Sequence, residues 1–491
     1  EPADLVLPLA AVLVATTIVF GAAWVVYRNS GRAALATSLI VVVVFAFGRV
    51  LDAAEGTPLS SGRLLAISAT LLLSGLAAIF LVRRDLRVLH QALSIVTAVL
   101  VVIASANIVA YEGPRALGAR PDVGNVARDP TTVGSTRTTR DIYYIVVEDL
   151  GSPEILRKYF GLTDEHAFEW FDQLGFRVAT DSATNYGKTI HMLASTMNMT
   201  YLDDLAEQVG TGSSDYHPLF KLVDNPSVAR FLKSNGYRYV HIGSWWDPTE
   251  ESSIADLNYG IAAPSDFNTT LLGTTIFPEI VERLPRLGIK LPAEVELKGE
   301  SAQYEGAVFA FSKLEELPRL AGPKFVFAHI LIPHEPFVFN ADGSRVTAKD
   351  RAGRSPNESF LQQSLYTIRR LKEVATKLLA GPEASRPIVI LQTDEGPNPP
   401  TWRKEGVNFD WTKASQQELE IKYPILNAFY LPGLPDAGVY PGITTVNTFR
   451  LVLGKYFGAD LPLLPDRLFI YRDKPHPYEL TDITERLRPS R

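Results

Sequence analysis

Hydrophobic residues follow two different patterns along this chain. Up to residue 111 they form long runs, and the charged residues fall in the joints between the runs. Runs of this length can cross the ~30 Å hydrocarbon core of a bilayer as helices, and the shortest reaches that length if its ends, including Arg49, extend toward the head groups. Four such runs in succession favour a membrane over a buried core or a cleavable signal peptide. We therefore predict a bundle of four transmembrane helices within residues 1–111, from the runs at 5–27, 33–47, 64–82 and 89–111.

The charges in the joints predict the orientation of this bundle. Arginine gathers in the first and third joints, at positions 28, 32, 83, 84 and 87, whereas the second joint carries Asp52 and Glu55. Because arginine-rich loops stay in the cytoplasm, both ends of the bundle should lie outside the cell. We predict an integral, multi-pass plasma-membrane protein with an extracytoplasmic domain. An external N-terminus is unusual without a preceding signal, so we hypothesise that another hydrophobic segment lies upstream of Glu1.

From residue 141 the pattern changes to short apolar runs that alternate with amphipathic helices. Buried strands that alternate with helices predict an α/β fold, here a mostly parallel sheet with helices on both faces. The polar, Gly- and Pro-rich residues 112–140 are predicted to be a linker, 141–475 the α/β domain with a helical excursion at 260–300, and 476–491 a covering tail. The strands are predicted at 142–147, 176–179, 236–246, 325–332, 387–392 and 425–431, and the helices at 153–160, 166–174, 360–379 and 448–457.

Polar residues follow directly after three of the buried strands. Glu148 and Asp149 follow the first, His334 follows 325–332, and Asp394 and Glu395 follow 387–392. Because ligands of open α/β sheets bind at the carboxyl ends of the strands, we expect these side chains at one rim. Carboxylates gathered so closely would repel one another, so a divalent metal is inferred among them. The alternative is that the acids cap helices or pair with basic residues, namely Lys188, Arg403 and Lys404.

Two further sequence features accompany this rim. Thr189 follows a Gly-Lys turn and opens a helical run, which puts its hydroxyl and its N–H group at a helix N-terminus. It is either an ordinary N-cap or a nucleophile toward phosphorus. Trp245 and Trp246 are the last two residues of the segment predicted at 236–246. They are candidates for a pocket wall, with ordinary packing as the alternative. His329 lies within a strand and is predicted to be a core histidine.

Composition excludes several classes of function. With 491 residues the chain needs two or more domains. Its net charge of -6 argues against a nucleic-acid-binding protein, which would carry a basic face. The chain has no cysteine, so disulfides, thiolate metal sites and cysteine nucleophiles are excluded. A formylglycine sulfatase needs a Cys or Ser in a C/S-x-P-x-R context, and no serine here has that context.

Four segments of the chain carry a resemblance to a known family, namely DIYYIVVEDLG, NYGKTIHMLAS, AHILIPHEPF and LQTDEGP. Through these segments the chain resembles membrane-anchored sulfatase-like proteins of the alkaline phosphatase superfamily, such as lipoteichoic acid synthases and phosphoethanolamine transferases. The resemblance covers most of 141–475 and implies an alkaline-phosphatase-like sheet. It implies a metal held by Glu148, Thr189 and Asp394, with His334 in contact with substrate. Glu395 stands where the family has histidine. An oxygen ligand there favours Mn²⁺ or Mg²⁺ over Zn²⁺, and it leaves open a domain that has lost catalysis.

The combined expectation is a metal-dependent phosphotransferase of the cell envelope. It would move a phosphoglycerol or phosphoethanolamine head group from a membrane phospholipid to a glycan or polymer, through a phosphothreonine at Thr189. The alternatives are a metal-dependent phosphodiesterase or phosphatase and a catalytically degenerate binding protein. The expected metal ligands are Glu148, Thr189, Asp394 and Glu395, and the expected substrate-binding residues are Asp149, Lys188, Trp245, Trp246 and His334.

Overall fold

The computed structural model of the protein divides the chain into two compact units. One unit comprises Glu1–Arg120 with Pro264–Gly299, and the other comprises Pro121–Ala263 with Glu300–Arg491. The structure describes residues 2–54, 59–82, 86–116, 138–261, 266–281, 283–284, 299–406, 409–434 and 438–488.

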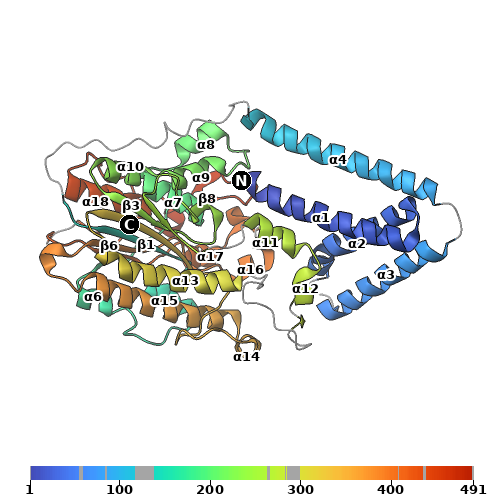
Figure 1. Cartoon of the computed structure of the whole chain (residues 1–491). Helices are drawn as coiled ribbons and strands as arrows, with labels where there is room; N and C mark the ends of the chain where they lie inside the picture. Colours follow the sequence, from blue (N-terminus) through green and yellow to red (C-terminus); the bar gives the residue numbers. More distant parts are fainter. Residues whose placement is uncertain are drawn as a thin grey trace. The chain divides into compact units, whose positions relative to one another are not determined.

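The first unit contains four long apolar helices, which confirms the four predicted runs as helices. Each is long and apolar enough to cross a membrane. Their bounds are α1 Pro2–Tyr27, α2 Ser30–Ala53, α3 Ser61–Leu81 and α4 Arg87–Ala116 (Figure 1). The hydroxyl of Tyr27 donates a hydrogen bond to the Leu76 carbonyl oxygen at 2.9 Å, which fastens α1 to α3. Residues 112–116 of the predicted linker continue α4, and 117–137 lie outside the described residues.

The same unit includes a segment that the sequence analysis assigned to the α/β domain. Helices α11 (Asp266–Gly273) and α12 (Phe277–Val281) lie within 264–299, where a helical excursion was predicted. The backbone between them pairs with α2, because Gly48 N donates to Thr274 O and Ile276 N donates to Val44 O, both at 2.9 Å. A Cβ atom at Gly48 would lie 2.1 Å from the Gly273 carbonyl oxygen, so this approach needs glycine.

The second unit is built on a mostly parallel seven-stranded sheet, in the order β2-β7-β6-β1-β5-β3-β4. Only β7 runs against its neighbours, since its pairings with β6 and β2 are antiparallel. Strand β1 is central and pairs with both β5 and β6 in parallel. The bounds are β1 Ile142–Glu148, β2 Arg177–Val178, β3 Arg238–Ile242, β4 Leu257–Tyr259, β5 Lys324–Pro333, β6 Ile388–Thr393 and β7 Asn427–Tyr430 (Figure 1).

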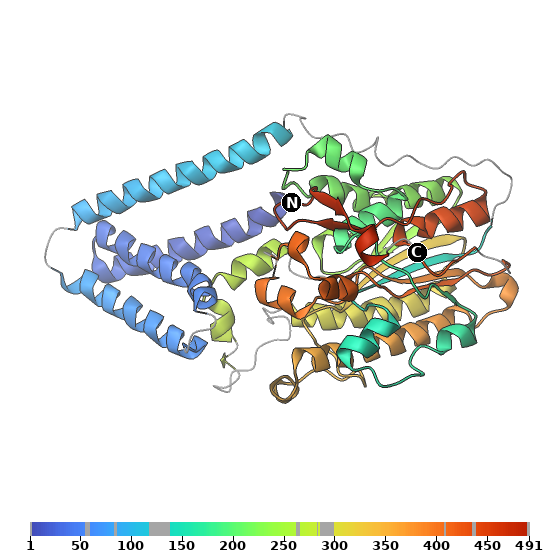
Figure 2. The ribbon, with the colours of Figure 1, turned by 180° about the vertical axis from the view of Figure 1, so that it is seen from behind.

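Helices cover both faces of this sheet, as predicted. Alternate residues of β1 supply two apolar cores: Tyr144 and Val146 belong to one, and Tyr143 and Ile145 to the other. The first core contains helices α7 Thr189–Asn198, α9 His217–Asp224, α10 Ser227–Ser234 and α18 Thr448–Phe457. The second contains α5 Pro153–Phe160, α6 Trp170–Leu174, α13 Glu300–Glu316 and α15 Pro356–Leu378 (Figures 1 and 2). The α/β prediction is thereby confirmed.

Several predicted boundaries shift for local reasons. Helix α15 begins four residues earlier than predicted, because Ser355 and Glu358 form a capping box around its first turn. Strand β9 (Leu480–Asp482) pairs with β8 (Phe469–Tyr471), so part of the predicted covering tail is a strand of a small antiparallel sheet. The remaining helices are α8 Asp203–Val209, α14 Ala348–Gly353, α16 Pro400–Glu405, α17 Gln416–Lys422 and α19 Thr484–Leu487.

Candidate active site

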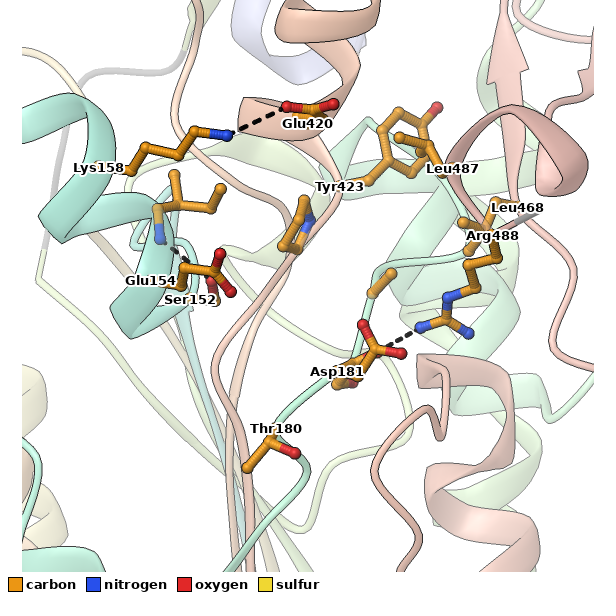
Figure 3. A pocket seen from close by; sticks show the side chains of 14 residues that line it. Ser152, Glu154, Lys158, Thr180, Asp181, Glu420, Tyr423, Leu468, Leu487 and Arg488 are labelled. Carbon is orange, nitrogen blue, oxygen red and sulfur yellow. Dashed lines mark hydrogen bonds and ion pairs between the residues drawn. The ribbon is translucent and has the colours of Figure 1, made fainter. Parts of the chain in front are cut away.

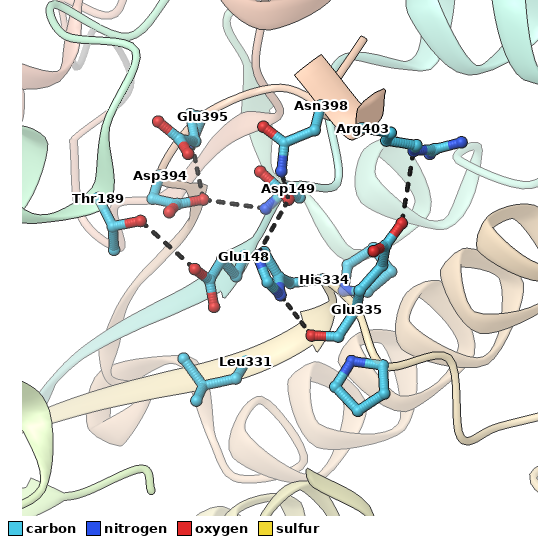
Figure 4. A network of polar contacts seen from close by, with 12 residues as sticks. Glu148, Asp149, Thr189, Leu331, His334, Glu335, Asp394, Glu395, Asn398 and Arg403 are labelled. Carbon is cyan, nitrogen blue, oxygen red and sulfur yellow. Dashed lines mark hydrogen bonds and ion pairs between the residues drawn. The ribbon is translucent and has the colours of Figure 1, made fainter. Parts of the chain in front are cut away.

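The carboxyl ends of β1, β5 and β6 bring together the polar residues that follow these strands (Figure 4). The register of β1 against β5 shifts after Val147, so that Glu148 pairs with Pro333, directly before His334. Asp149 then takes a left-handed backbone conformation with φ of 60°. Such a φ is costly for a residue with a side chain, so the surrounding contacts must hold Asp149 in this turn.

Thr189 is the first residue of α7 and faces Glu148. The N-cap residue is Lys188, which makes no side-chain capping bond, so Thr189 is not the N-cap of this helix. The Thr189 side chain is buried, and its hydroxyl Oγ1 donates to Glu148 Oε1 at 3.4 Å. The first N–H groups of an α-helix have no partner within the helix. Thr189 therefore stands between a carboxylate and a helix end suited to an anion.

Asp394 connects the ends of β1 and β6. Its Oδ1 atom accepts hydrogen bonds from Asp149 N at 3.0 Å and from Glu395 N at 2.7 Å. Its Oδ2 atom is buried without a hydrogen-bond partner, and so is Oε2 of Glu395. Buried acceptors are normally satisfied, so two orphan carboxylate oxygens at one rim point to a missing positive partner.

Lys422, at the end of α17, is a member of this cluster that the sequence analysis missed. Its Nζ atom lies 2.8 Å from Glu395 Oε1 and 3.2 Å from Asp149 Oδ1, and it donates to Asn398 Oδ1 at 2.6 Å. Asn398 in turn donates to Asp149 Oδ2 at 3.1 Å. The lysine side chain is 1% exposed. The alternative without a metal named Lys188, Arg403 and Lys404 as partners of the acids, and Lys422 was not among them.

Local backbone contacts bring Lys422 to this position. Gly396 N donates to the Lys422 carbonyl oxygen at 2.7 Å. A Cβ atom at Gly396 would lie 2.2 Å from the Ile421 carbonyl oxygen, so only glycine allows α17 to approach this closely. Gly396, which follows the two acids, is the sequence signal for a close backbone contact. The signal does not identify α17 as the segment that makes this contact. Arg403, which the alternative without a metal named as a partner, lies 3.4 Å from Glu335 Oε1.

Burial and mutual repulsion perturb the acids of the cluster. Burial raises the pKa of Glu148 to about 7, with His334 opposing the shift and Asp149 and Glu395 adding to it. Burial and the charge of Glu395 raise the pKa of Asp394 well above its usual value. Burial also raises the pKa of Glu395, although the Lys422 ammonium opposes the shift. One lysine therefore does not offset all the negative charge of this rim.

The chemistry of these side chains suits a hard divalent cation, but their present placement does not bring enough of them together to hold one. Carboxylate and hydroxyl oxygens are the donors that Mg²⁺ and Mn²⁺ prefer, and the orphan oxygens of Asp394 and Glu395 are available. As the side chains stand, no group of three or more His, Asp or Glu in the described ranges could hold an ion. A cation would therefore need the Thr189 hydroxyl as a ligand or a small movement of the acids.

The predicted substrate-binding residues lie in different parts of the rim. His334 Nε2 is 3.9 Å from Asp149 Oδ2. Burial alone would lower the pKa of His334, but the Glu148 and Asp149 carboxylates outweigh it and raise the pKa. Lys188 lies over the ring of Tyr471, 5.5 Å from its centroid, and burial lowers its pKa. The carboxylates beside His334 and the burial of Lys188 thus shift the two pKa values in opposite directions.

The tryptophan pair contacts strand β5 and helix α13. Trp245 Nε1 donates to Gln303 Oε1 at 2.6 Å, and the ring of Trp246 packs edge-on against His329 with centroids 5.8 Å apart. His329 is buried, and the hydroxyl of Thr249 lies 2.9 Å from its Nδ1. His329 is buried in the core, as expected from the sequence, but its Nε2 atom has no hydrogen-bond partner among the described residues, so the histidine is not fully satisfied. Both tryptophans are partly buried, and a role for them in binding stays a prediction.

The buried His329 is expected to make the stability of the protein depend on pH. Burial lowers the pKa of His329 from 6.5 to about 3. On acidification the unfolded chain therefore binds a proton at this residue near pH 6.5, and the folded chain binds it only near pH 3. Stability from this residue is present above pH 6.5 and is lost as the pH falls toward 3. Between pH 7 and 5 we expect wild type to lose about 2 kcal/mol more free energy of unfolding than His329→Asn, measured by urea unfolding in detergent.

The exposed His166, whose side chain is 77% exposed and pairs with Glu169, provides the control. Its replacement by asparagine should leave the loss on acidification at least as large as in wild type. Equal losses for wild type and His329→Asn would contradict the burial account.

A separate cavity of about 280 Å³ lies behind the β1 loop, and none of the predicted site residues lines it. Several of its charged groups have partners: Lys158 lies 3.4 Å from Glu420, and Arg488 Nη2 donates to the backbone oxygen of Asp181 (Figure 3). Arg488 Nη1 also donates to Gly442 O at 2.8 Å. The cavity is therefore not the candidate site. Its lining includes Ser152, Glu154, Ile155, Lys158, Thr180, Asp181, Glu420, Tyr423 and Arg488.

The chain is similar to several solved structures at low sequence identity. The structure is similar to the periplasmic domain of EptC. This domain, from Escherichia coli, is 11% identical with a TM-score of 0.43, over 72% of this chain and 96% of that one. The lipoteichoic acid synthase LtaP from Listeria monocytogenes is 14% identical with a TM-score of 0.39, over 72% and 83%. BT1596, a 2-O GAG sulfatase, is 11% identical with a TM-score of 0.41, over 68% and 78%.

These similarities describe the course of the chain alone. At identities of 11–14% and TM-scores below 0.5, they transfer no substrate and no residue role to this protein. No family model matches the chain, and no curated protein matches it. The roles of the site residues therefore have to follow from the geometry of this chain.

Proposed function

We propose that this protein is a phosphotransferase of the cell envelope that passes a phospholipid head group to a glycan or polymer through a phosphothreonine at Thr189. The observation that carries the proposal is the hydrogen bond of 3.4 Å from the Thr189 hydroxyl to Glu148 Oε1, at the N-terminus of α7. Four helices of membrane-spanning length in the same chain support a substrate in the membrane. Such an anchor would keep the site near its lipid donor.

The residues divide the first chemical step among them. The Thr189 oxygen attacks phosphorus, Glu148 Oε1 takes the hydroxyl proton, and the bond from phosphorus to the diacylglycerol oxygen breaks. The N–H groups that begin α7 donate to the phosphoryl oxygens. His334, whose pKa is raised, stands near Asp149 and is our candidate to give a proton to the leaving oxygen. In the second step His334 takes the proton of an acceptor hydroxyl as the acceptor oxygen attacks phosphorus. The bond from phosphorus to the Thr189 oxygen breaks, and Glu148 returns its proton to Thr189.

A divalent cation would complete this arrangement. The residues proposed to hold it are Glu148, Thr189, Asp394 and Glu395, and once bound it would offset charge that develops on the phosphoryl oxygens. Oxygen donors favour Mn²⁺ or Mg²⁺. The EptC domain has also been solved in complex with Zn, which is a property of that protein.

Lys422 supports a second candidate function. Its ion pairs with Glu395 and Asp149 offset part of the negative charge without a metal. In that case the rim would bind an envelope polymer or a partner and catalyse nothing.

The transfer reaction can be tested with the full chain in detergent, phospholipids with labelled head groups, and an envelope glycan. We expect diacylglycerol release that needs a divalent ion and that increases when the acceptor glycan is added. The label should appear on the glycan. Release that is independent of the acceptor, with free phosphorylated head group as product, would indicate a hydrolase. The absence of release under all these conditions would favour the binding protein.

A further inference from the structure

The loop that carries His334 is held by two buried glutamines from different helices. Gln363 on α15 is completely buried, and Gln303 on α13 is 1% exposed. A glutamine amide can accept at its oxygen and donate twice from its nitrogen. Gln363 uses both its oxygen and its nitrogen on the backbone at the end of β5 and in the loop that follows, and Gln303 uses its nitrogen there. The loop therefore has two points of attachment.

Gln363 holds both sides of this loop. Its Oε1 atom accepts from Val338 N at 2.7 Å and from Phe339 N at 3.1 Å. Its Nε2 atom donates to His334 O at 2.9 Å and to Pro333 O at 3.2 Å. Since donors meet the oxygen and acceptors meet the nitrogen, only this orientation of the amide satisfies all four groups.

Gln303 adds a second attachment at the same residue. Its Nε2 atom donates to His334 O at 3.1 Å and to Leu331 O. Its Oε1 atom accepts from Trp245 Nε1 at 2.6 Å. The carbonyl oxygen of His334 therefore accepts hydrogen bonds from two helices. Through Gln303 it is also connected to the segment after β3 that contains Trp245 and Trp246, called the tryptophan loop below.

These attachments determine where the imidazole of His334 lies. The His334 Nδ1–H group donates to the carbonyl oxygen of Glu335, which directs Nε2 toward Asp149 (Figure 4). In the described residues the imidazole itself makes no hydrogen bond to α13 or α15. The hydrogen bonds from these helices go to the backbone of the loop. The loop backbone thus places the ring, and the glutamines place the backbone.

We propose that Gln363 and Gln303 are positioning residues that hold His334 against the acidic rim, and that Gln303 links this position to Trp245. Among the described contacts, neither glutamine bonds to Glu148, Asp149, Asp394 or Glu395. The inference that this affects turnover depends on the proposed function, but the positioning of the ring does not. A ligand that moved Trp245 in the tryptophan loop would then change the position of His334 through the Gln303 side chain.

The test compares Gln363→Met and Gln303→Met with Gln362→Met in the full chain. Gln362 is the matched control, because it is the neighbouring residue on α15 and bonds to Ala341 N at 3.2 Å, away from His334. The first readout needs no turnover: the rate at which diethylpyrocarbonate modifies His334, followed by peptide mass spectrometry. We expect a rise of about tenfold in Gln363→Met, a smaller rise in Gln303→Met, and none in Gln362→Met.

The second readout is a double-mutant cycle on transfer activity. If Gln363 acts through His334, Gln363→Met should lower kcat in the wild-type background and have no further effect in His334→Ala. Additive effects of the two substitutions would overturn the positioning role. So would unchanged His334 modification in Gln363→Met protein that melts as a folded chain. A wild type without transfer activity would refute the proposed function and leave the modification result to decide this inference.

Discussion

Replacing Thr189 by valine is expected to lower transfer activity by at least about 10³-fold, because the substitution keeps the shape of the side chain and removes the nucleophile. Thr189→Ser, which keeps a hydroxyl, should retain a measurable fraction of the activity. The comparison is made on initial rates of diacylglycerol release by the full chain in detergent. A loss confined to the valine variant assigns the effect to the hydroxyl.

Stability measurements separate this chemical effect from a loss of structure. The Thr189 hydroxyl makes a single long hydrogen bond, to Glu148, so its removal should change the melting temperature little. If Thr189→Val released diacylglycerol at the wild-type rate, Thr189 would not be the nucleophile. The proposed function would then lose the residue on which it depends.

Replacing Lys422 by methionine is expected to lower the free energy of unfolding by about 3–5 kcal/mol, because it leaves the buried carboxylates of Asp149 and Glu395 without their cation. The ammonium of Lys422 contacts both carboxylates and Asn398. Urea unfolding of the full chain at neutral pH measures the loss. The methionine fills similar volume, so little of the loss should come from a cavity.

Two further variants make this prediction specific. Lys413 pairs with Asp410 at 3.0 Å but is 82% exposed, and Lys413→Met should change the free energy of unfolding by about 0–1 kcal/mol. Adding Glu395→Gln to Lys422→Met should restore part of the stability, since it removes one of the two unpaired charges. If Lys422→Met were no more destabilising than Lys413→Met, the lysine would not be the cation of this cluster.

Several features of the site could be predicted because they depend on local sequence. The run from Ile142 to Val147 is apolar throughout, which is typical of a central strand, and the acids after it mark the strand end. The Gly-Lys turn before Thr189 marks the start of α7. Because the carboxyl ends of parallel strands share one edge, the proximity of Glu148, His334 and Asp394 followed from the fold class.

Other features depend on contacts that no local pattern reveals. Lys422 ends an ordinary amphipathic helix, and nothing near it in sequence shows that this ammonium is buried against Asp149. Gln303 and Gln363 likewise occur in helices whose pattern indicates only a covered face. The segment at 264–299 was assigned to the α/β domain because it lies between two of its strands, yet its backbone pairs with α2. The positions of these residues and of this segment are determined by tertiary packing, which the local sequence does not reveal.

The most direct test of the central proposal is to look for the phosphothreonine itself. Full-length protein is incubated with phospholipid and Mn²⁺ without an acceptor, quenched in acid, and digested, and the peptide that contains Thr189 is examined by mass spectrometry. The proposal predicts the mass of a phosphorylated head group on Thr189, which disappears when the acceptor glycan is added. An unmodified Thr189 in a preparation that releases diacylglycerol would contradict it.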